Sequence, residues 1–268
     1  MTSSRLEVGV ATAEDAGQGD RGDGPLRAAA WGVHLYTAIG LVLAAWIAVL
    51  LVRGGAEAFR WAFVLMLVAT LVDATDGTLA RKFRVKSVLP DFDGRKLDDI
   101  IDFLTYTSLP LLLIWRANLL PEAMEAWLLL PLLASAYGFC QVEVKTDDGY
   151  FLGFPSLWNV VALYLYVLGL PGWLALGIVV ALSLLTFVPS RYLYPSSQPG
   201  ALNVASTLLG AFWCVLLLVV LWRLPAAGPV APPDGLTWWL AAASLYYPAF
   251  YMAASWAVTL RHHRAHRI

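Results

Sequence analysis

Apolar residues occur in long runs along most of this chain, and short polar or Gly/Pro-containing segments separate the runs. Because about 20 apolar residues in a helix cross the hydrocarbon core of a bilayer, such runs predict transmembrane helices. We expect eight spans, at residues 28–52, 58–80, 97–115, 122–142, 156–170, 172–189, 202–222 and 236–260. The pattern therefore predicts an all-α polytopic integral membrane protein, a bundle of about eight transmembrane helices.

The boundary between the fifth and sixth spans is the least distinct. Only the four residues from Gly169 to Gly172 separate the two apolar runs. One helix of their combined length would far exceed the thickness of a bilayer. We therefore expect a tight hairpin at this point.

Composition supports the membrane prediction and divides the chain. Of its 268 residues 59% are hydrophobic and 14% are charged, and the mean hydropathy is +0.67. The net charge of −1 and the absence of a basic, aromatic stripe argue against a nucleic-acid partner. Residues 1–24 contain few large apolar side chains, so we expect a disordered cytoplasmic tail there. The membrane domain then covers residues 25–260, and residues 261–268 form a basic tail.

The distribution of basic residues predicts the orientation. With the N-terminus in the cytoplasm, 14 of the 18 Lys and Arg residues fall in cytoplasmic segments, and Arg53, Arg60, Arg116 and Arg223 remain outside. This asymmetry follows the positive-inside rule. We expect both termini to be cytoplasmic.

Four aspartates stand at the cytoplasmic ends of the second and third spans. Asp73 and Asp76 share one helical face, and Asp98 and Asp102 share another. A carboxylate within a span costs about 2.5 kcal/mol or more, so four together require a cation and a function. Salt bridges to the basic loop between the spans are the alternative, which the regular spacing disfavours.

Two facing stripes of this kind would form a cage of carboxylates. Hard oxygen ligands without nearby His or Cys suit Mg²⁺ or Mn²⁺, and this number of carboxylates could hold two ions. Gly77 and Ala80 lie on the first stripe and allow close approach of a ligand, and Arg81 could pair with a phosphate.

These residues resemble the signature of the CDP-alcohol phosphotransferase family. The chain reads D-x-x-D-G-x-x-A-R from Asp73 to Arg81 and G-x-x-x-D-x-x-x-D from Gly94 to Asp102, which matches all eight fixed positions. Twelve residues separate Arg81 from Gly94, more than in most members. The longer spacer resembles that of the bacterial phosphatidylcholine synthases.

The resemblance implies a fold, an activity and roles for the motif residues. It implies a CDP-alcohol phosphotransferase-like homodimer in the bacterial inner membrane that transfers the phosphatidyl group of CDP-diacylglycerol to choline and releases CMP. By position in the motif, Asp73, Asp76 and Asp98 are expected to bind the metal, and Asp102 is expected to act as general base and also contact an ion. The remaining motif residues are expected to bind the CDP-lipid together with Asp73, and they are Gly77, Ala80, Arg81 and Gly94.

Choline carries a quaternary ammonium group, which cannot donate hydrogen bonds and needs aromatic faces and a carboxylate. Candidates near the cytoplasmic ends of later spans are Tyr137, Gln141, Glu143, Tyr150, Trp158 and Tyr192. Aromatic residues are also common at membrane interfaces, and an ion pair between Glu143 and Arg191 explains that carboxylate equally well.

Two other functions are compatible with parts of the pattern. A related phosphatidyltransferase could use serine, glycerol phosphate or inositol phosphate as acceptor, although phosphate-bearing acceptors would need more basic residues. A divalent-cation transporter would also place carboxylates in the membrane. Transport predicts acidic residues across the bilayer or an inverted repeat, whereas here the acids cluster at one face.

Overall fold

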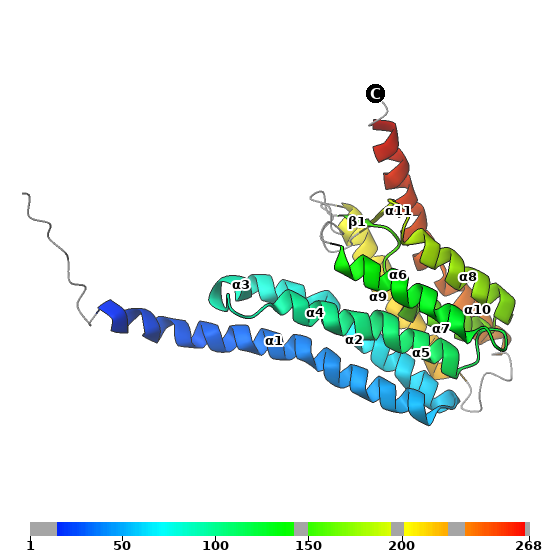
Figure 1. Ribbon diagram of the computed structural model, residues 1–268, viewed down its shortest axis with the longest axis horizontal. Coiled ribbons are helices and arrows are strands. Elements are labelled where there is room, and N and C mark those ends of the chain that lie inside the picture. Colours follow the sequence, from blue (N-terminus) through cyan, green and yellow to red (C-terminus); the bar gives the residue numbers. More distant parts are fainter. Residues whose placement is uncertain (1–14, 142–149, 194–200, 225–233, 266–268) are drawn as a thin grey trace, which may run out of the picture.

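The computed structural model describes residues 15–141, 150–193, 201–224 and 234–265, and the fold is helical throughout, with one short strand pair (Figure 1). The α-helices are α1 Asp15–Arg53, α2 Ala56–Lys82, α3 Val85–Val88, α4 Gly94–Asp102, α5 Leu109–Arg116, α6 Leu129–Cys140, α7 Trp158–Leu168, α8 Gly172–Leu185, α9 Ala201–Arg223, α10 Gly235–Ser244 and α11 Tyr246–Ala265. A π-helix, η1 Phe103–Ser108, joins α4 to α5, and a 3₁₀ helix, η2 Glu125–Leu128, precedes α6. Helices occupy all eight predicted spans, which confirms the all-α membrane fold.

The helices differ in length. Three of the described helical segments are long and apolar enough to cross a membrane by themselves, at Gly24–Arg53, Ala56–Lys82 and Val204–Arg223. Shorter apolar helices occur at Glu125–Cys140, Trp158–Leu168 and Gly172–Leu185. The third predicted span is built from α4, η1 and α5 in direct succession.

The predicted hairpin between α7 and α8 is present. Gly169 ends α7 with a φ of 58°, a left-handed conformation that favours glycine, and Pro171 immediately precedes α8. A side chain at Gly172 would lie 3.0 Å from the backbone nitrogen of Pro121. The start of α8 therefore packs closely against the connection that follows α5.

The core joins the central helices of the bundle. Its fully enclosed side chains include Ile47, Leu51, Leu113, Ile114, Val167, Val179 and Leu221. Large apolar side chains on the outer faces of α1 and α9, among them Trp46, Phe212 and Trp222, are exposed. Such broad apolar surfaces are expected where a protein faces lipid.

A two-stranded ribbon was not among the expected elements. Strand β1 (Tyr150–Leu152) pairs antiparallel with β2 (Arg191–Leu193), so that Tyr150 faces Leu193. Helix α11 covers the other edge of β2. The hydroxyl of Ser255 accepts a hydrogen bond from the backbone N–H of Leu193 at 3.0 Å, and the hydroxyl of Thr259 accepts one from the N–H of Arg191 at 2.8 Å. These side chains satisfy backbone groups that a two-stranded sheet alone would leave unpaired.

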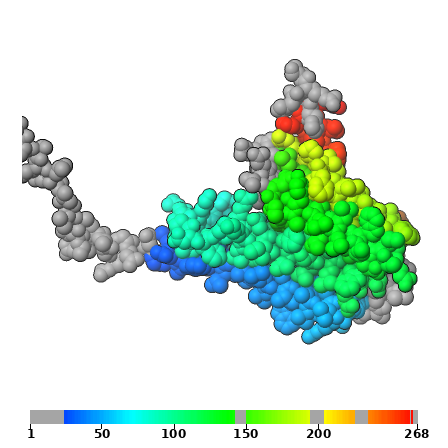
Figure 2. All heavy atoms as spheres, viewed as in Figure 1, coloured from blue at the N-terminus to red at the C-terminus, as the bar shows by residue number. Residues whose placement is uncertain are grey.

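The first and last described helices, α1 and α11, reach beyond the predicted spans. Helix α1 begins at Asp15, so the last ten residues of the segment for which we expected disorder are helical, and residues 1–14 lie outside the described residues. Helix α11 continues to Ala265 and projects beyond the bundle. In the space-filling view, α1 and α2 form one side of the visible face, and α6 and α8 form the other (Figure 2).

Candidate active site

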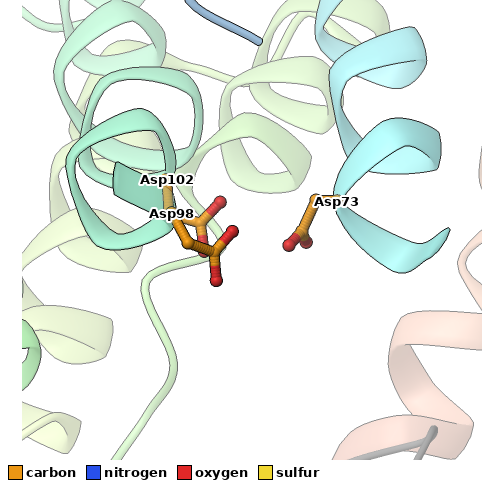
Figure 3. Close-up of side chains that lie close together, drawn as sticks. All are labelled: Asp73, Asp98 and Asp102. Carbon is orange, nitrogen blue, oxygen red and sulfur yellow. The ribbon is translucent and has the colours of Figure 1, made fainter. Parts of the chain in front are cut away.

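Three of the four aspartates meet between two helices. One carboxylate oxygen from each of Asp73, Asp98 and Asp102 lies within 4.8 Å of the others. Asp73 comes from α2, and Asp98 and Asp102 stand one turn apart on α4 (Figure 3). The side chains point toward one another across the space between the helices, as the two predicted stripes require.

The connection between the helices sets this register. Helix α4 begins at Gly94, and the carboxylate of Asp93 caps it by accepting the backbone N–H of Lys96 at 3.2 Å. This hydrogen bond, together with the charge of Lys96, lowers the pKa of Asp93. The cap fixes the start of α4, and Asp98 and Asp102 lie on the face of α4 turned toward Asp73 on α2.

Asp76 is held differently from the other three aspartates. Its buried carboxylate accepts a hydrogen bond from the hydroxyl of Thr37 on α1, with an oxygen–oxygen distance of 2.9 Å. It also neighbours Asp98. Thr37 therefore links a third helix to the site. Sequence reasoning missed this residue, although a polar side chain on an apolar helix was the available signal.

Tyr106 is the second residue that sequence reasoning missed. Its hydroxyl donates to Oδ2 of Asp73 at 2.7 Å, and its ring is buried. Tyr106 lies in η1, four residues after Asp102. Its spacing of four residues from Asp102 gave no usable signal, because the π-helix that contains Tyr106 departs from the regular α-helical repeat.

The described donor set fits a hard divalent cation. Three carboxylates converge, and Oδ1 of Asp102 is buried without a hydrogen-bond partner among the described residues. A buried, unpaired carboxylate oxygen beside two further carboxylates is costly unless positive charge compensates it. Oxygen-only ligands are those that Mg²⁺ and Mn²⁺ accept.

The motif glycines have different surroundings. A Cβ at Gly77 would meet only the guanidinium of Arg81, at an ordinary 3.6 Å, so space remains there for a ligand. The exposed Arg81 side chain also donates to the hydroxyl of Thr78 at 3.0 Å. At Gly94, by contrast, a Cβ would lie 2.5 Å from the His34 ring. The small size of Gly94 thus serves helix packing.

Ala80 also contacts protein. It packs against a small apolar cluster formed by Ala30, Val33, Val85 and Leu89. This cluster joins α1, α2 and the connection that contains α3. Of the three small motif residues expected beside the nucleotide, Gly77 has the most open surroundings in the described structure.

The choline candidates do not share one location. Tyr137 is 48% exposed on α6, and its ring pairs with that of Phe187. Tyr150 lies on β1, with the guanidinium carbon of Arg191 5.8 Å from its ring centre. Gln141 directly follows α6. Glu143 lies outside the described residues.

The other two candidates are enclosed. Trp158 is fully buried, and its indole N–H donates to the hydroxyl of Ser135 at 2.9 Å. Tyr192 is also fully buried, between the rings of Phe154 and Tyr251. Both side chains thus take part in packing α7 and β2 against their neighbours.

The whole aspartate site lies inside one family match. Residues 34–188 match the family described as CDP-alcohol phosphatidyltransferase, which is more than half of the chain. The chain belongs to this family. Membership confirms the resemblance seen in the sequence, whose motif lies on the neighbouring helices α2 and α4.

Curated relatives resemble the chain over most of its length. A phosphatidylcholine synthase of Pseudomonas aeruginosa is 41% identical over 82% of this chain and 90% of its own length. One from Bradyrhizobium diazoefficiens is 38% identical over 73% of this chain and 72% of its own length. One from Borreliella burgdorferi is 34% identical over 62% of this chain and 70% of its own length.

Proposed function

We propose that this protein is a phosphatidylcholine synthase, which transfers the phosphatidyl group of CDP-diacylglycerol to choline and releases CMP. The convergence of Asp73, Asp98 and Asp102 carries the proposal for the chemistry. The similarity to phosphatidylcholine synthases over 82% of the chain supports choline as the acceptor.

The proposed reaction is a single displacement at phosphorus. The choline hydroxyl oxygen forms a bond to the lipid-linked phosphorus, the bond from that phosphorus to the CMP oxygen breaks, and the hydroxyl proton passes to Asp102. The buried, unpartnered Oδ1 of Asp102 is available to accept this proton. Phosphoryl-transfer chemistry of this kind depends mainly on positioning and charge neutralisation.

Asp73, Asp98 and Asp102 would hold Mg²⁺ or Mn²⁺, with Asp76 as a further ligand of a pair of ions. Bound there, the cations would neutralise the diphosphate and stabilise the departing CMP. Thr37 and Tyr106 orient two of these carboxylates through their hydroxyl groups. The open surroundings of Gly77 support a role beside the nucleotide, and its neighbour Arg81 would contact phosphate. For Ala80 and Gly94 we propose a role in shaping the pocket through packing.

For the acceptor site we retain the candidates that keep accessible surface. Tyr137 is exposed, and Gln141 and Tyr150 are partly exposed. An aromatic ring of Tyr137 or Tyr150 would bind the quaternary ammonium, and Glu143 would supply the carboxylate. We propose supporting roles for Trp158 and Tyr192, since both are enclosed.

We further propose a homodimer in the inner membrane with both termini and the aspartate site cytoplasmic. The positive-inside distribution of Lys and Arg supports this orientation. Arg116 at the end of α5 donates to the carbonyls of Leu51 and Val52 at the end of α1, both at 3.0 Å, so these two ends meet at one face. Residues 25–260 would form the catalytic domain between two cytoplasmic tails. Cross-linking in nanodiscs and protease accessibility in inverted vesicles test these points.

The direct test measures CMP release by the purified protein in detergent, with CDP-diacylglycerol and Mn²⁺. Choline is compared with serine, inositol, inositol phosphate, glycerol 3-phosphate and no acceptor. We expect choline-dependent CMP release and phosphatidylcholine as the lipid product. Release with another acceptor alone would replace choline but keep the aspartate chemistry, and no release from a folded, metal-supplied sample would refute the proposal.

A further inference from the structure

Tyr106 makes a short hydrogen bond to the aspartate cluster. Its phenol donates to Oδ2 of Asp73 at 2.7 Å, and the residue is only 9% exposed. A hydrogen bond from a hydroxyl to a carboxylate is stronger than one between neutral groups, especially away from water. The contact also joins η1 to α2, so it bridges the two helices that carry the three carboxylates.

The backbone around Tyr106 is unusual. Residues Phe103–Ser108 form a π-helix, and the N–H of Leu109 reaches back to the carbonyl of Leu104. Such π turns add a residue to the helical repeat and are frequent at functional sites. The wider turn changes the direction in which the Tyr106 side chain leaves the helix relative to Asp102. The phenol lies against Asp73 on α2.

A second layer of polar contacts lies behind this pair. Thr70, one turn before Asp73 on α2, is another polar neighbour of the Tyr106 hydroxyl. The Thr70 hydroxyl accepts the side-chain N–H of Asn159 at 3.2 Å. Asn159 is buried near the start of α7. The Tyr106 hydroxyl therefore has a second polar neighbour besides Asp73, and Asn159 in turn holds that neighbour in place.

We propose that Tyr106 is a positioning residue that holds Asp73 in the orientation needed for metal binding. With Oδ2 engaged by the phenol, the rotation of the carboxylate is restricted, and Asp73 is pre-organised toward Asp98 and Asp102. Removing such an outer partner of a metal ligand typically weakens metal binding by roughly 10–100-fold. The inference deepens the proposed function, because it rests on the aspartates binding a divalent cation.

The test measures Mn²⁺ binding to the full-length protein in detergent without substrate, by electron paramagnetic resonance of free Mn²⁺. Tyr106→Phe keeps the ring and removes only the hydroxyl. We expect its affinity for Mn²⁺ to fall roughly 10-fold. In activity assays, the Mn²⁺ concentration for half-maximal rate should rise by the same factor, and the rate at saturating Mn²⁺ should approach that of the wild type.

Tyr164→Phe is the matched control. Its hydroxyl is also buried and hydrogen-bonded, to Ser244 and to the indole N–H of Trp213, both at 2.8 Å, but it lies outside the aspartate site. We expect its Mn²⁺ affinity to equal that of the wild type. An affinity of Tyr106→Phe within twofold of the wild type would overturn the proposal, as would an equal loss in both variants.

A double variant keeps the test decisive if Tyr106→Phe alone does not fold. Asp73→Asn replaces the charge that would lose its donor by a neutral amide, so Asp73→Asn with Tyr106→Phe should be better tolerated than Tyr106→Phe alone. If Tyr106 acts through Asp73, the double variant binds Mn²⁺ as weakly as Asp73→Asn alone. A further loss would overturn the assignment. Wild-type protein that binds no Mn²⁺ would also overturn it. If the protein binds Mn²⁺ but choline does not support CMP release, only the proposed acceptor is wrong, and the assignment of Tyr106 stands.

Discussion

The imidazole ring of His34 fills the space that a side chain at residue 94 would occupy. A Cβ at Gly94 would lie 2.5 Å from Cε1 of His34, and the ring is 7% exposed and packs against Phe92. Gly94 is one turn before Asp98 on α4. The contact therefore fixes how closely α1 approaches the helix that carries two of the three clustered carboxylates.

This contact predicts that Gly94→Ala destabilises the protein. The added methyl must displace a buried ring, and overpacking of this kind costs about 1–3 kcal/mol. We expect a lower thermal unfolding midpoint in detergent. Gly77→Ala is the matched comparison, because the new methyl meets only Arg81 at 3.6 Å, and its midpoint should stay close to that of the wild type.

A compensating substitution separates crowding from other causes. Combining His34→Ala with Gly94→Ala restores room between α1 and α4, so the double variant should be more stable than additive single effects predict. Additive losses would show that the ring does not limit the volume of residue 94.

The aspartates on α4 are expected to be essential for CMP release. Asp98→Asn and Asp102→Asn each keep side-chain shape and remove charge, and we expect rates to fall by at least about 100-fold, since general-base catalysis alone contributes that much. Asp91→Asn, in the exposed connection before α4, should retain activity. Substantial activity in both α4 variants, with folding verified by gel filtration, would contradict the mechanism.

Thr37 is expected to matter through Asp76. Thr37→Val removes the hydroxyl that donates to the buried carboxylate, and losing a hydrogen bond to a charged group costs about 1.5–3 kcal/mol. We expect a higher Mn²⁺ requirement together with a lower unfolding midpoint. Thr37→Ser keeps the donor and should restore the Mn²⁺ requirement. If Val and Ser behave alike, the hydroxyl is not the feature that matters.

The aromatic candidates should separate into two classes. Tyr137→Ala removes an exposed ring, and we expect it to raise KM for choline without changing KM for CDP-diacylglycerol. Trp158→Phe removes a buried indole that donates to Ser135, so its main effect should be a lower unfolding midpoint. A choline-specific KM effect in Trp158→Phe alone would assign the acceptor site to the start of α7.

The cap of α10 predicts a pH-dependent local stability. The hydroxyl and backbone N–H of Thr237 and the guanidinium of Arg223 lower the pKa of Asp234. A group with a lowered folded pKa stabilises above its unfolded pKa, near 3.9, and loses that effect as the pH falls through the folded value. Asp234→Asn should therefore speed hydrogen exchange at the start of α10 at pH 7, and the difference from wild type should shrink below about pH 4.

The sequence alone determined the helical membrane fold, the α7–α8 hairpin and the facing stripes that carry Asp73, Asp98 and Asp102. These features depend on local regularities, namely apolar run length, turn residues and the 3.6-residue helical repeat, so they can be read from spacing. The family could be identified for the same reason, because its motif lies within one short stretch.

Only the tertiary structure showed which residues support the site. Thr37 and Tyr106 reach their aspartates from positions 39 and 33 residues away in the chain, and His34 meets Gly94 across two helices. The enclosure of Trp158 and the ribbon between β1 and β2 likewise depend on distant segments. Helix packing brings such residues together, and packing depends on the shapes of whole surfaces, which no local spacing rule contains.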